Sequence, residues 1–246
     1  MSKDGFENEH QIVNYLNKRK FKDLNQNMTK LLNVMFKSKI NNADTVYACK
    51  ITGVEKSDIC IKINDERHFV SVKKGSGNSI HQEKLEVFID FLKKEYNLDK
   101  NTANSLRFYI WGDGTIDGTG EIKNRLNARE LKKNYPKIIE DINNFFNEHK
   151  EELISRFLIK GTESVIEPDY IYYGTCEEGI GISINDTIEW LLKQPTSSIG
   201  MSKLTFQAWN RNIKGGNKTE NRRGVIQLKW GSIANDLNEI WENKYG

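Results

Sequence analysis

One stretch of the sequence, residues 56–84, brings together an acid and an amine that could act on the same substrate. Asp58 opens a run of alternating apolar residues, a short polar turn follows, and a second run ends in Lys73. Two apolar runs joined by a short polar turn predict a β-hairpin, in which these two ends lie side by side. A carboxylate that binds a divalent cation and a lysine that orients water are the groups that metal-assisted phosphodiester cleavage requires.

The elements around this hairpin follow from the spacing of apolar residues. Helical spacing occurs at residues 3–19, 21–36, 81–96, 127–149, 150–159 and 233–245. Strand patterns occur at residues 45–51, 165–173, 179–184, 202–209 and 225–230. No internal repeat or low-complexity linker divides the chain. We therefore expect an α/β (α+β) protein.

Two glycine-rich segments predict loops. Residues 75–79 lead into the helix predicted at 81–96, and amides at the start of that helix could hold a phosphate. The alternative is a plain strand-to-helix connection, since the segment lacks both common nucleotide-binding patterns. Residues 111–120 predict turns, with Asp113 or Asp117 as weaker candidates for a role in catalysis or DNA contact.

Composition is typical of a globular protein with a polar surface: 246 residues, 37% hydrophobic and 29% charged. No apolar run approaches the ~20 residues of a membrane helix, and the first residues show no apolar signal core. Three cysteines (Cys49, Cys60 and Cys176) have no metal-ligand spacing. We expect reduced thiols and a cytoplasmic protein without a membrane partner.

Basic residues gather near the C-terminal end. Residues 200–230 hold seven Lys or Arg against one acid, Glu220, so this window carries +6. Because the whole chain carries +3, the remainder sums to −3. Such local basicity suggests a polyanionic partner, and the alternative is a solvated basic face.

The same window carries side chains suited to reading bases. They are Gln207, Asn210, Arg211, Arg222, Arg223, Gln227 and Lys229. Arg and Lys suit guanine, and Asn and Gln suit adenine. We expect Arg211 and either Arg222 or Arg223 to contact bases, while Lys214 and Lys218 contact phosphates. The alternative is that Trp209 and Trp230 are core residues and the charged side chains contact phosphates only.

Asp58 and Lys73 resemble the PD-(D/E)XK nuclease signature, in which an Asp and a (D/E)-X-K triplet flank a β-hairpin. The triplet here, at residues 71–73, is Ser-Val-Lys, so its first position is not acidic. Two-carboxylate metal binding is the usual arrangement, although some members use a neutral residue there. The missing acid could come from Glu83, which we place at the start of the following helix, or from Glu9 on the first helix.

Further segments extend this resemblance from residue 3 to about residue 236, in patches through the middle third. Segments at residues 3–6, 8–9, 56–59, 72–73 and 214–216 resemble, in the same order, small Type II restriction endonucleases that cut GCGC tetranucleotides. Residues 71–83, 111–115 and 207–211 are similar to restriction-type endonucleases of this length. The resemblance implies a PD-(D/E)XK (restriction endonuclease-like) fold, with a central mixed β-sheet and flanking helices. It also implies cleavage of double-stranded DNA that depends on Mg²⁺ (or Mn²⁺) and leaves 5′-phosphate ends.

The resemblance also assigns expected roles to residues. The catalytic and metal-binding set is Asp58, Ser71, the Val72 carbonyl, Lys73, Glu83 and Glu9. Independently of the resemblance, we expect contacts near the scissile phosphate from residues that closely follow Lys73: Ser76, Asn78, His81 and Gln82. Gln82 could also orient a water, and His81 is more typical of a helix start than of a general base.

We expect one endonuclease domain over residues 1–246, with a catalytic core at 1–110 and a DNA-recognition region at 160–232. The expected partners are DNA with a short specific site and a cognate DNA methyltransferase, and the enzyme could act as a monomer or a homodimer. Two alternatives stay open: a repair or nicking nuclease of the same fold, and an inactivated nuclease that only binds DNA. Ser71 is the residue that keeps the last alternative open.

Overall fold

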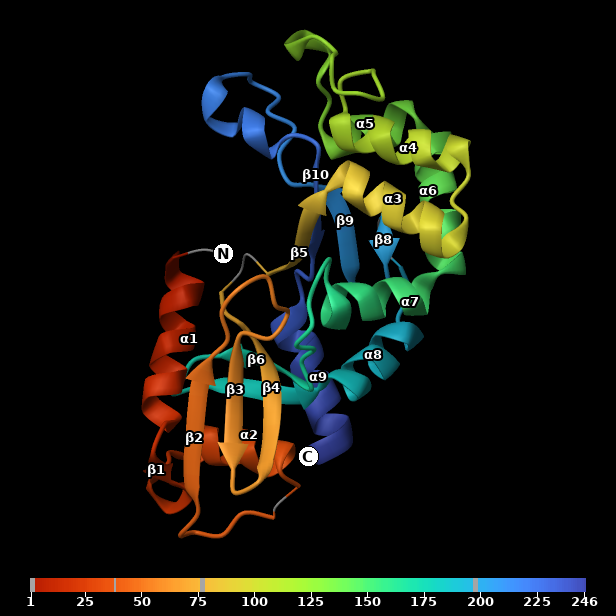
Figure 1. Cartoon of the computed structure of the whole chain (residues 1–246). Helices are drawn as coiled ribbons and strands as arrows, with labels where there is room; N and C mark the ends of the chain where they lie inside the picture. Colours follow the sequence, from red (N-terminus) through yellow and green to blue (C-terminus); the bar gives the residue numbers. More distant parts are fainter. Residues whose placement is uncertain (1–2, 38, 76–77, 197–198) are drawn as a thin grey trace. The chain divides into compact units, whose positions relative to one another are not determined.

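The chain folds into two compact units in the computed structural model, which describes residues 3–37, 39–75, 78–196 and 199–246 (Figure 1). The first unit contains Met1–Asn78, Ser155–Lys193 and Gly231–Gly246, and the second contains Ser79–Ile154 and Gln194–Trp230. These boundaries do not coincide with residues 110 and 160, so the division into catalytic core and recognition region stays a prediction. Within the described residues, no helix is long and apolar enough to cross a membrane.

The first unit is built on a six-stranded sheet in the order β1-β2-β3-β4-β6-β7. The strands are β1 (Arg19–Lys20), β2 (Thr45–Lys50), β3 (Ile59–Ile63), β4 (Glu66–Lys73), β6 (Tyr170–Gly174) and β7 (Gly179–Ser183). Only β4 and β6 pair in parallel among these strands, so the sheet is mixed. The predicted hairpin is confirmed as β3 and β4, whose two-residue turn begins at Asn64 with a positive φ of 52°.

One face of this sheet forms the core of the first unit. Val46, Ala48, Ile61 and Val70 point to that face and pack against α1 (Lys3–Leu16) and α2 (Gln26–Met35). The predicted helix at 21–36 is divided, because η1 (Phe21–Asp23) precedes Asn25, whose side chain caps α2 by accepting from the Met28 amide. Strand side chains alternate between faces, so the intervening residues of β2, β3 and β4 lie on the opposite face.

The remaining helices of the first unit come from the later part of the chain. They are η3 (Arg156–Lys160), a single π-helical segment, α8 (Ile184–Lys193) and α9 (Ile233–Tyr245). α9 packs beside β7, and its bounds are those predicted from apolar spacing. α7 (Lys150–Ser155) runs from the second unit into the first.

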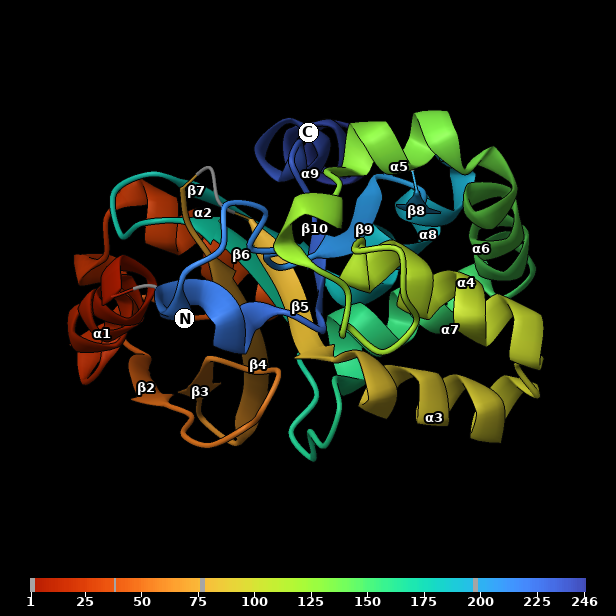
Figure 2. The ribbon, with the colours of Figure 1, turned by 90° about the horizontal axis from the view of Figure 1, so that it is seen from above.

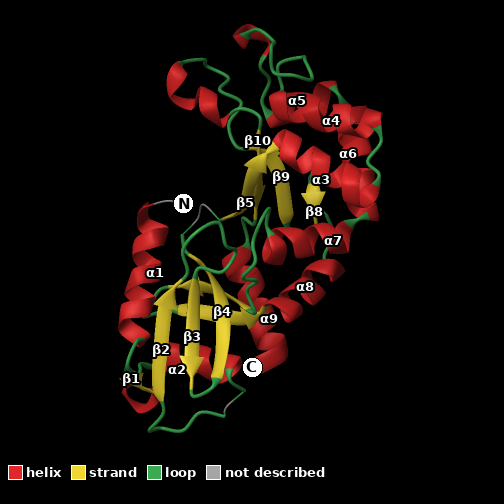
Figure 3. Cartoon of the chain, viewed as in Figure 1, coloured by secondary structure: helices red, strands yellow, loops and turns green. Residues whose placement is uncertain are grey.

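The second unit has a four-stranded antiparallel sheet in the order β5-β10-β9-β8 (Figure 3). Its strands are β5 (Ser79–Lys84), β8 (Gly200–Met201), β9 (Leu204–Ala208) and β10 (Val225–Lys229). Its helices are α3 (Leu85–Tyr96), α4 (Lys100–Trp111), η2 (Ile122–Asn124), α5 (Ala128–Asn134), α6 (Pro136–Glu148) and η4 (Asn217–Arg222). α4 and α6 lie side by side in both views (Figures 1 and 2). Phe206 of β9 packs against the rings of Phe88 on α3 and Phe146 on α6.

The prediction of a helix over residues 81–96 was wrong in its first turn. Residues 79–84 form β5, and the helix begins only at Leu85. β5 pairs along its length with β10, about 140 positions later in the chain. The local sequence pattern does not show that a partner strand so far along the chain will pair with these residues. That pairing decides whether a short ambiguous segment becomes a strand.

His68 of β4 joins two acids near the start of the strand. Its Nε2 lies 3.1 Å from Glu66 and its Nδ1 3.6 Å from Asp169, and its ring meets Phe36 and Tyr170 edge to face. The hydrogen bond with Asp169 raises the pKa of His68 above its ordinary 6.5, and Glu66 acts in the same direction against partial burial.

We predict that His68 stabilises the fold in mildly acidic solution. Because the folded-state pKa is raised, its contribution is complete below pH 6.5 and is lost as the pH rises through the folded value. The free energy of unfolding of wild type minus that of His68→Gln should fall by up to about 1 kcal/mol between pH 5.5 and 8.5. Urea unfolding across this range measures it, and a difference that grows with pH would contradict the assignment.

Candidate active site

Asp58 and three successive residues of β4 form a hydrogen-bonded group on the sheet face that points away from α1 and α2. Asp58 Oδ2 accepts from the Val72 amide at 2.6 Å, from Lys73 Nζ at 3.2 Å and from Ser71 Oγ at 3.3 Å. The hairpin register produces this group, because Ile59 pairs with Val70 and the Asp58 amide donates to the Val70 carbonyl, which brings the Asp58 carboxylate to Ser71 and Val72. The two ends of the hairpin meet as the sequence predicts.

The Lys73 ammonium lies among three oxygen atoms of this group. Nζ is 2.7 Å from Ser71 Oγ, 3.1 Å from the Val72 carbonyl and 3.2 Å from Asp58 Oδ2. A cationic group therefore already sits where carboxylate, hydroxyl and carbonyl oxygens converge. Such hard oxygen donors suit Mg²⁺, which commonly uses one or two carboxylates and keeps several waters. The oxygen atoms of this group are thus of the kind that binds Mg²⁺, and Asp58 is the one acid among them.

Glu83 lies in β5 of the second unit, so the prediction that it starts a helix was wrong. Its side chain is 8% exposed and lies 2.9 Å from His81 Nε2. Glu83 pairs with Ile226 and His81 with Leu228, so both point to the helix-covered face of that sheet. The structure therefore places His81 in a strand beside Glu83, and metal binding by Glu83 stays a prediction.

Glu9 belongs to α1 and is only 2% exposed. Lys50 Nζ approaches its Oε2 to 2.6 Å and also lies 3.1 Å from the Phe6 ring centroid. Lys50 lies two positions after Ala48 in β2 and therefore shares the face toward α1, whereas Ser71 and Lys73 lie on the other face. The structure therefore pairs Glu9 with Lys50 rather than with the Asp58 group. Across the described residues, no cluster of three His, Cys, Asp or Glu could hold a metal.

The residues predicted near the scissile phosphate are divided between the two units. Ser76 lies outside the described residues. Asn78 is a buried residue of the first unit, and its Oδ1 is buried without a hydrogen-bond partner in the part of the chain that is described. Gln82 is an exposed residue of β5.

Three glutamines stand directly opposite one another on the second sheet. Gln82 pairs with Gln227, and Gln227 pairs with Gln207. Gln207 Nε2 donates to Gln227 Oε1 at 3.0 Å, and Gln227 Nε2 donates to Ser79 Oγ at 3.1 Å. Their neighbours Phe206 and Leu228 point to the helices, so this glutamine row (Gln82, Gln227 and Gln207) lies on the opposite face of the sheet.

Two of the three arginines predicted to read bases are engaged inside the second unit. Arg211 is buried and its Nη2 donates to the Tyr109 carbonyl at 2.7 Å. Arg223 Nη2 lies 2.6 Å from Asp113 Oδ2, with side chains 5% and 0% exposed. Arg222 is exposed, and its guanidinium lies 4.8 Å from the Trp209 ring centroid.

Asp113 is the residue whose role sequence reasoning missed. Burial raises its pKa, but hydrogen bonds from Thr115 and Arg223 outweigh burial and hold the pKa below its ordinary value. A signal was present in the sequence, because Asp-Gly-Thr occurs at 113–115 and again at 117–119, and each Asp accepts from its Thr. Asp113 therefore bonds the glycine-rich segment at residues 111–120 to the loop between β9 and β10, residues 209–224, which we call the basic loop.

Glu220 is the second acid that organises the basic loop. Hydrogen bonds from Asn212 and Arg223 lower its pKa to about 2. Arg125 also lies 3.3 Å from Glu220, and its Nη1 donates to the Asn212 carbonyl at 2.8 Å. The cations of this loop that remain exposed are Lys214, Lys218 and Arg222.

Comparison with known proteins finds similarity in structure rather than in sequence. No family model matches the chain, and no curated protein gives a significant match. The restriction endonuclease MspI, solved in complex with its cognate DNA, superposes with a TM-score of 0.58 over 90% of this chain and 87% of that chain, at 13% identity. The chain has a restriction endonuclease-like fold. The predicted fold class, a mixed sheet with flanking helices, is confirmed.

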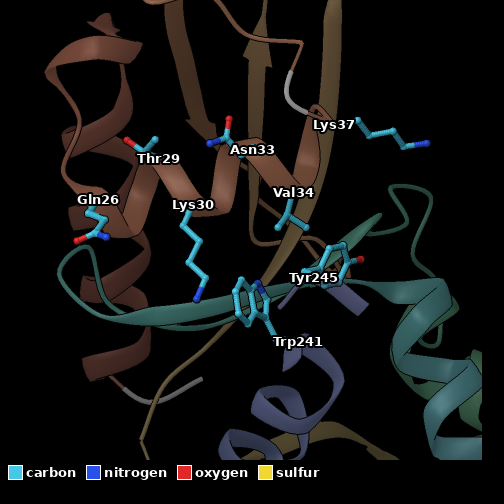
Figure 4. Close-up of a pocket in the computed structure, with 8 residues that line it drawn as sticks. All are labelled: Gln26, Thr29, Lys30, Asn33, Val34, Lys37, Trp241 and Tyr245. Atoms are coloured by element: carbon cyan, nitrogen blue, oxygen red, sulfur yellow. The ribbon is translucent and has the colours of Figure 1, made fainter. Parts of the chain in front are cut away.

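A groove of about 750 Å³ in the first unit contains none of the predicted site residues (Figure 4). Its walls are α2 and α9, and Lys30 extends to 3.3 Å from the Trp241 ring centroid. α2 packs on the core face of the sheet, opposite Ser71 and Lys73. In this restriction endonuclease-like fold, the groove is therefore separate from the Asp58 group.

We predict that removing Asp113 destabilises the second unit. Asp113→Ala removes the buried carboxylate from Arg223 and leaves the more exposed Glu220 as its acid, which costs roughly 1–3 kcal/mol in free energy of unfolding. The cost of Asp113→Ala with Arg223→Ala should be less than the sum of the single variants. Chemical denaturation measures both. Asp117→Ala, in the exposed copy of the same motif, is the matched control and should unfold like wild type.

Proposed function

We propose that the protein is a Type II restriction endonuclease that cleaves double-stranded DNA at a short specific site and requires Mg²⁺. The observation that carries the proposal is the convergence of Asp58, Ser71 and Lys73 on one face of a hairpin within a restriction endonuclease-like fold. MspI, which shares that fold, was solved with DNA bound. Ser71 in place of an acid is the departure that the experiments below address.

The chemistry assigns a separate task to each residue. Asp58, the Val72 carbonyl and Ser71 would hold Mg²⁺, which supplies an acidified water and offsets charge on the phosphate. The Val72 amide holds the Asp58 carboxylate in place. Lys73 would orient water for in-line attack on the scissile phosphate, and its ammonium would offset the charge that develops there. The expected products carry 5′-phosphate and 3′-hydroxyl ends.

DNA reading is proposed for the second unit. Gln227 is buried and bonded to Gln207 and Ser79, whereas Gln82 is exposed and Gln207 half-buried. The amide side chains of Gln82 and Gln207 can pair with the edge of adenine in the major groove. The exposed cations Lys214, Lys218 and Arg222 suit phosphate contacts, and Arg222 also suits a base contact. Because a site-specific nuclease threatens its own host, we propose a cognate DNA methyltransferase as the protein's functional partner.

We predict that Asp58→Asn and Lys73→Ala each reduce plasmid cleavage by roughly 10²–10⁴-fold, the range for loss of a catalytic group. DNA binding should stay measurable in a gel-shift assay, because phosphate contacts elsewhere remain. Lys74→Ala changes the neighbouring exposed lysine and should cleave like wild type. Wild-type activity in Asp58→Asn would contradict the assignment.

The same plasmid assay separates the proposal from its alternatives. Discrete fragments that require Mg²⁺ and vanish with EDTA support a restriction enzyme. Nicked circles alone would indicate a nicking nuclease of the same fold. Retardation of DNA by wild type without any cleavage would indicate an inactivated nuclease that only binds DNA.

We predict opposite effects from two substitutions of Ser71. Ser71→Ala removes one of the three oxygens around Lys73 and should raise the Mg²⁺ concentration needed for half-maximal cleavage. Ser71→Asp supplies a second carboxylate and should lower that concentration by roughly tenfold, since one additional charged contact of about 1.4 kcal/mol has that effect. Mg²⁺ titration of the initial cleavage rate measures both. An identical Mg²⁺ requirement in the two variants would exclude Ser71 as a metal ligand.

A further inference from the structure

Three exposed side chains form a row across the sheet of the first unit. The strand register pairs Tyr47 of β2 with Lys62 of β3, and Lys62 with Arg67 of β4. Directly opposed residues of antiparallel strands point to the same face. All three are exposed, Tyr47 by 50%. We call Tyr47, Lys62 and Arg67 the cationic row.

The cationic row lies on the same sheet face as the candidate active site. In β4, Arg67, Ser71 and Lys73 are separated by even numbers of residues, so their side chains share a face. Lys62 alternates with Ile61 and Ile63, which are buried in the core on the other face. Arg67 and Ser71 are four positions apart, which corresponds to roughly 13 Å along the strand.

The two cations of the row carry charge that the described residues do not neutralise. Neither Lys62 nor Arg67 forms an ion pair with an acid in the described part of the chain. The Arg67 guanidinium lies 5.6 Å from the Phe69 ring centroid, which keeps it extended over the sheet face. The nearby acid Asp169 is engaged by the Phe69 amide and by His68. An ammonium, a guanidinium and a phenol hydroxyl in one line are donors that bind phosphate oxygens.

We propose that the cationic row binds the DNA backbone beyond the bond that is cut. A distance of roughly 13 Å corresponds to about four nucleotides at 3.4 Å each. This proposal rests on the proposed function, because it takes the DNA strand to run over the sheet face that carries Asp58 and Lys73. Charge complementarity and continuity with that group favour DNA over a protein partner. The groove between α2 and α9, on the core side of the sheet, does not share this continuity.

The salt dependence of DNA affinity tests the row. Wild type, the double variant Lys62→Gln/Arg67→Gln and the control Lys94→Gln are compared in EDTA, where no cleavage occurs. Each lost phosphate contact removes about 0.9 from the slope of log affinity against log salt, so the double variant should lose about 1.8. Lys94, 82% exposed on α3, should leave the slope unchanged. The charge-conserving pair Lys62→Arg/Arg67→Lys should keep the wild-type slope, which separates loss of charge from loss of structure.

Replacing single phosphates of the DNA by uncharged linkages then locates the phosphate that the cationic row contacts. A methylphosphonate walked along one strand should weaken binding by wild type at about four nucleotides from the cut and leave the double variant unaffected there. An unchanged slope or absence of this coupling would overturn the proposal. An unchanged slope together with loss of self-association in light scattering would assign the row to a second copy of the chain and would also overturn it.

The cleavage assay on the same preparations keeps the two proposals distinguishable. If wild type cleaves with Mg²⁺ and the slope does not change, only the cationic row fails. If wild type never cleaves and the slope falls as expected, the row stands as a DNA-binding surface and the nuclease assignment fails.

Discussion

The hydrogen bond from the Val72 amide to the Asp58 carboxylate is the interaction on which the candidate site depends. It exists only in the observed β3–β4 register, because a shift of one residue would turn Ser71 and Lys73 toward the apolar core. Val46, Ala48, Ile61 and Val70 hold that register by burying the other face. The packing of α1 and α2 on one face of the hairpin thus positions the Asp58 group on the other.

In this protein, the burial of an acidic side chain does not by itself show whether its role is structural or chemical. Glu9, Glu83 and Asp113 are all buried, and each has a basic or titratable partner within its own unit. A buried carboxylate is costly unless it is paired and hydrogen-bonded, so such pairs are what a stable fold requires. Asp58 differs, because its partner Lys73 also contacts two further oxygens and lies on a face that ends in exposed cations.

Each unit carries polar side chains on part of one sheet face. In the first unit, the Asp58 group and the cationic row lie on the face of β2, β3 and β4 that points away from α1 and α2, whereas Ile171 and Ile182 are buried on the same face at β6 and β7. In the second unit, the glutamine row lies on the face opposite the helices. Apolar side chains on a sheet face are covered by other elements, and a stretch of polar side chains is where the sheet can meet a ligand. The chemistry proposed for this chain uses both of these faces.

The sequence by itself determined the hairpin and the pairing of Asp58 with Lys73, because two alternating runs and a two-residue turn are local signals. It likewise predicted α9 and most strands. Tertiary structure decided that residues 79–84 form a strand, and that Arg211 and Arg223 bond groups about 100 positions away rather than remain exposed. Local periodicity shows which face of an element is apolar. It does not show which distant group will meet a polar side chain, and that depends on how the chain packs.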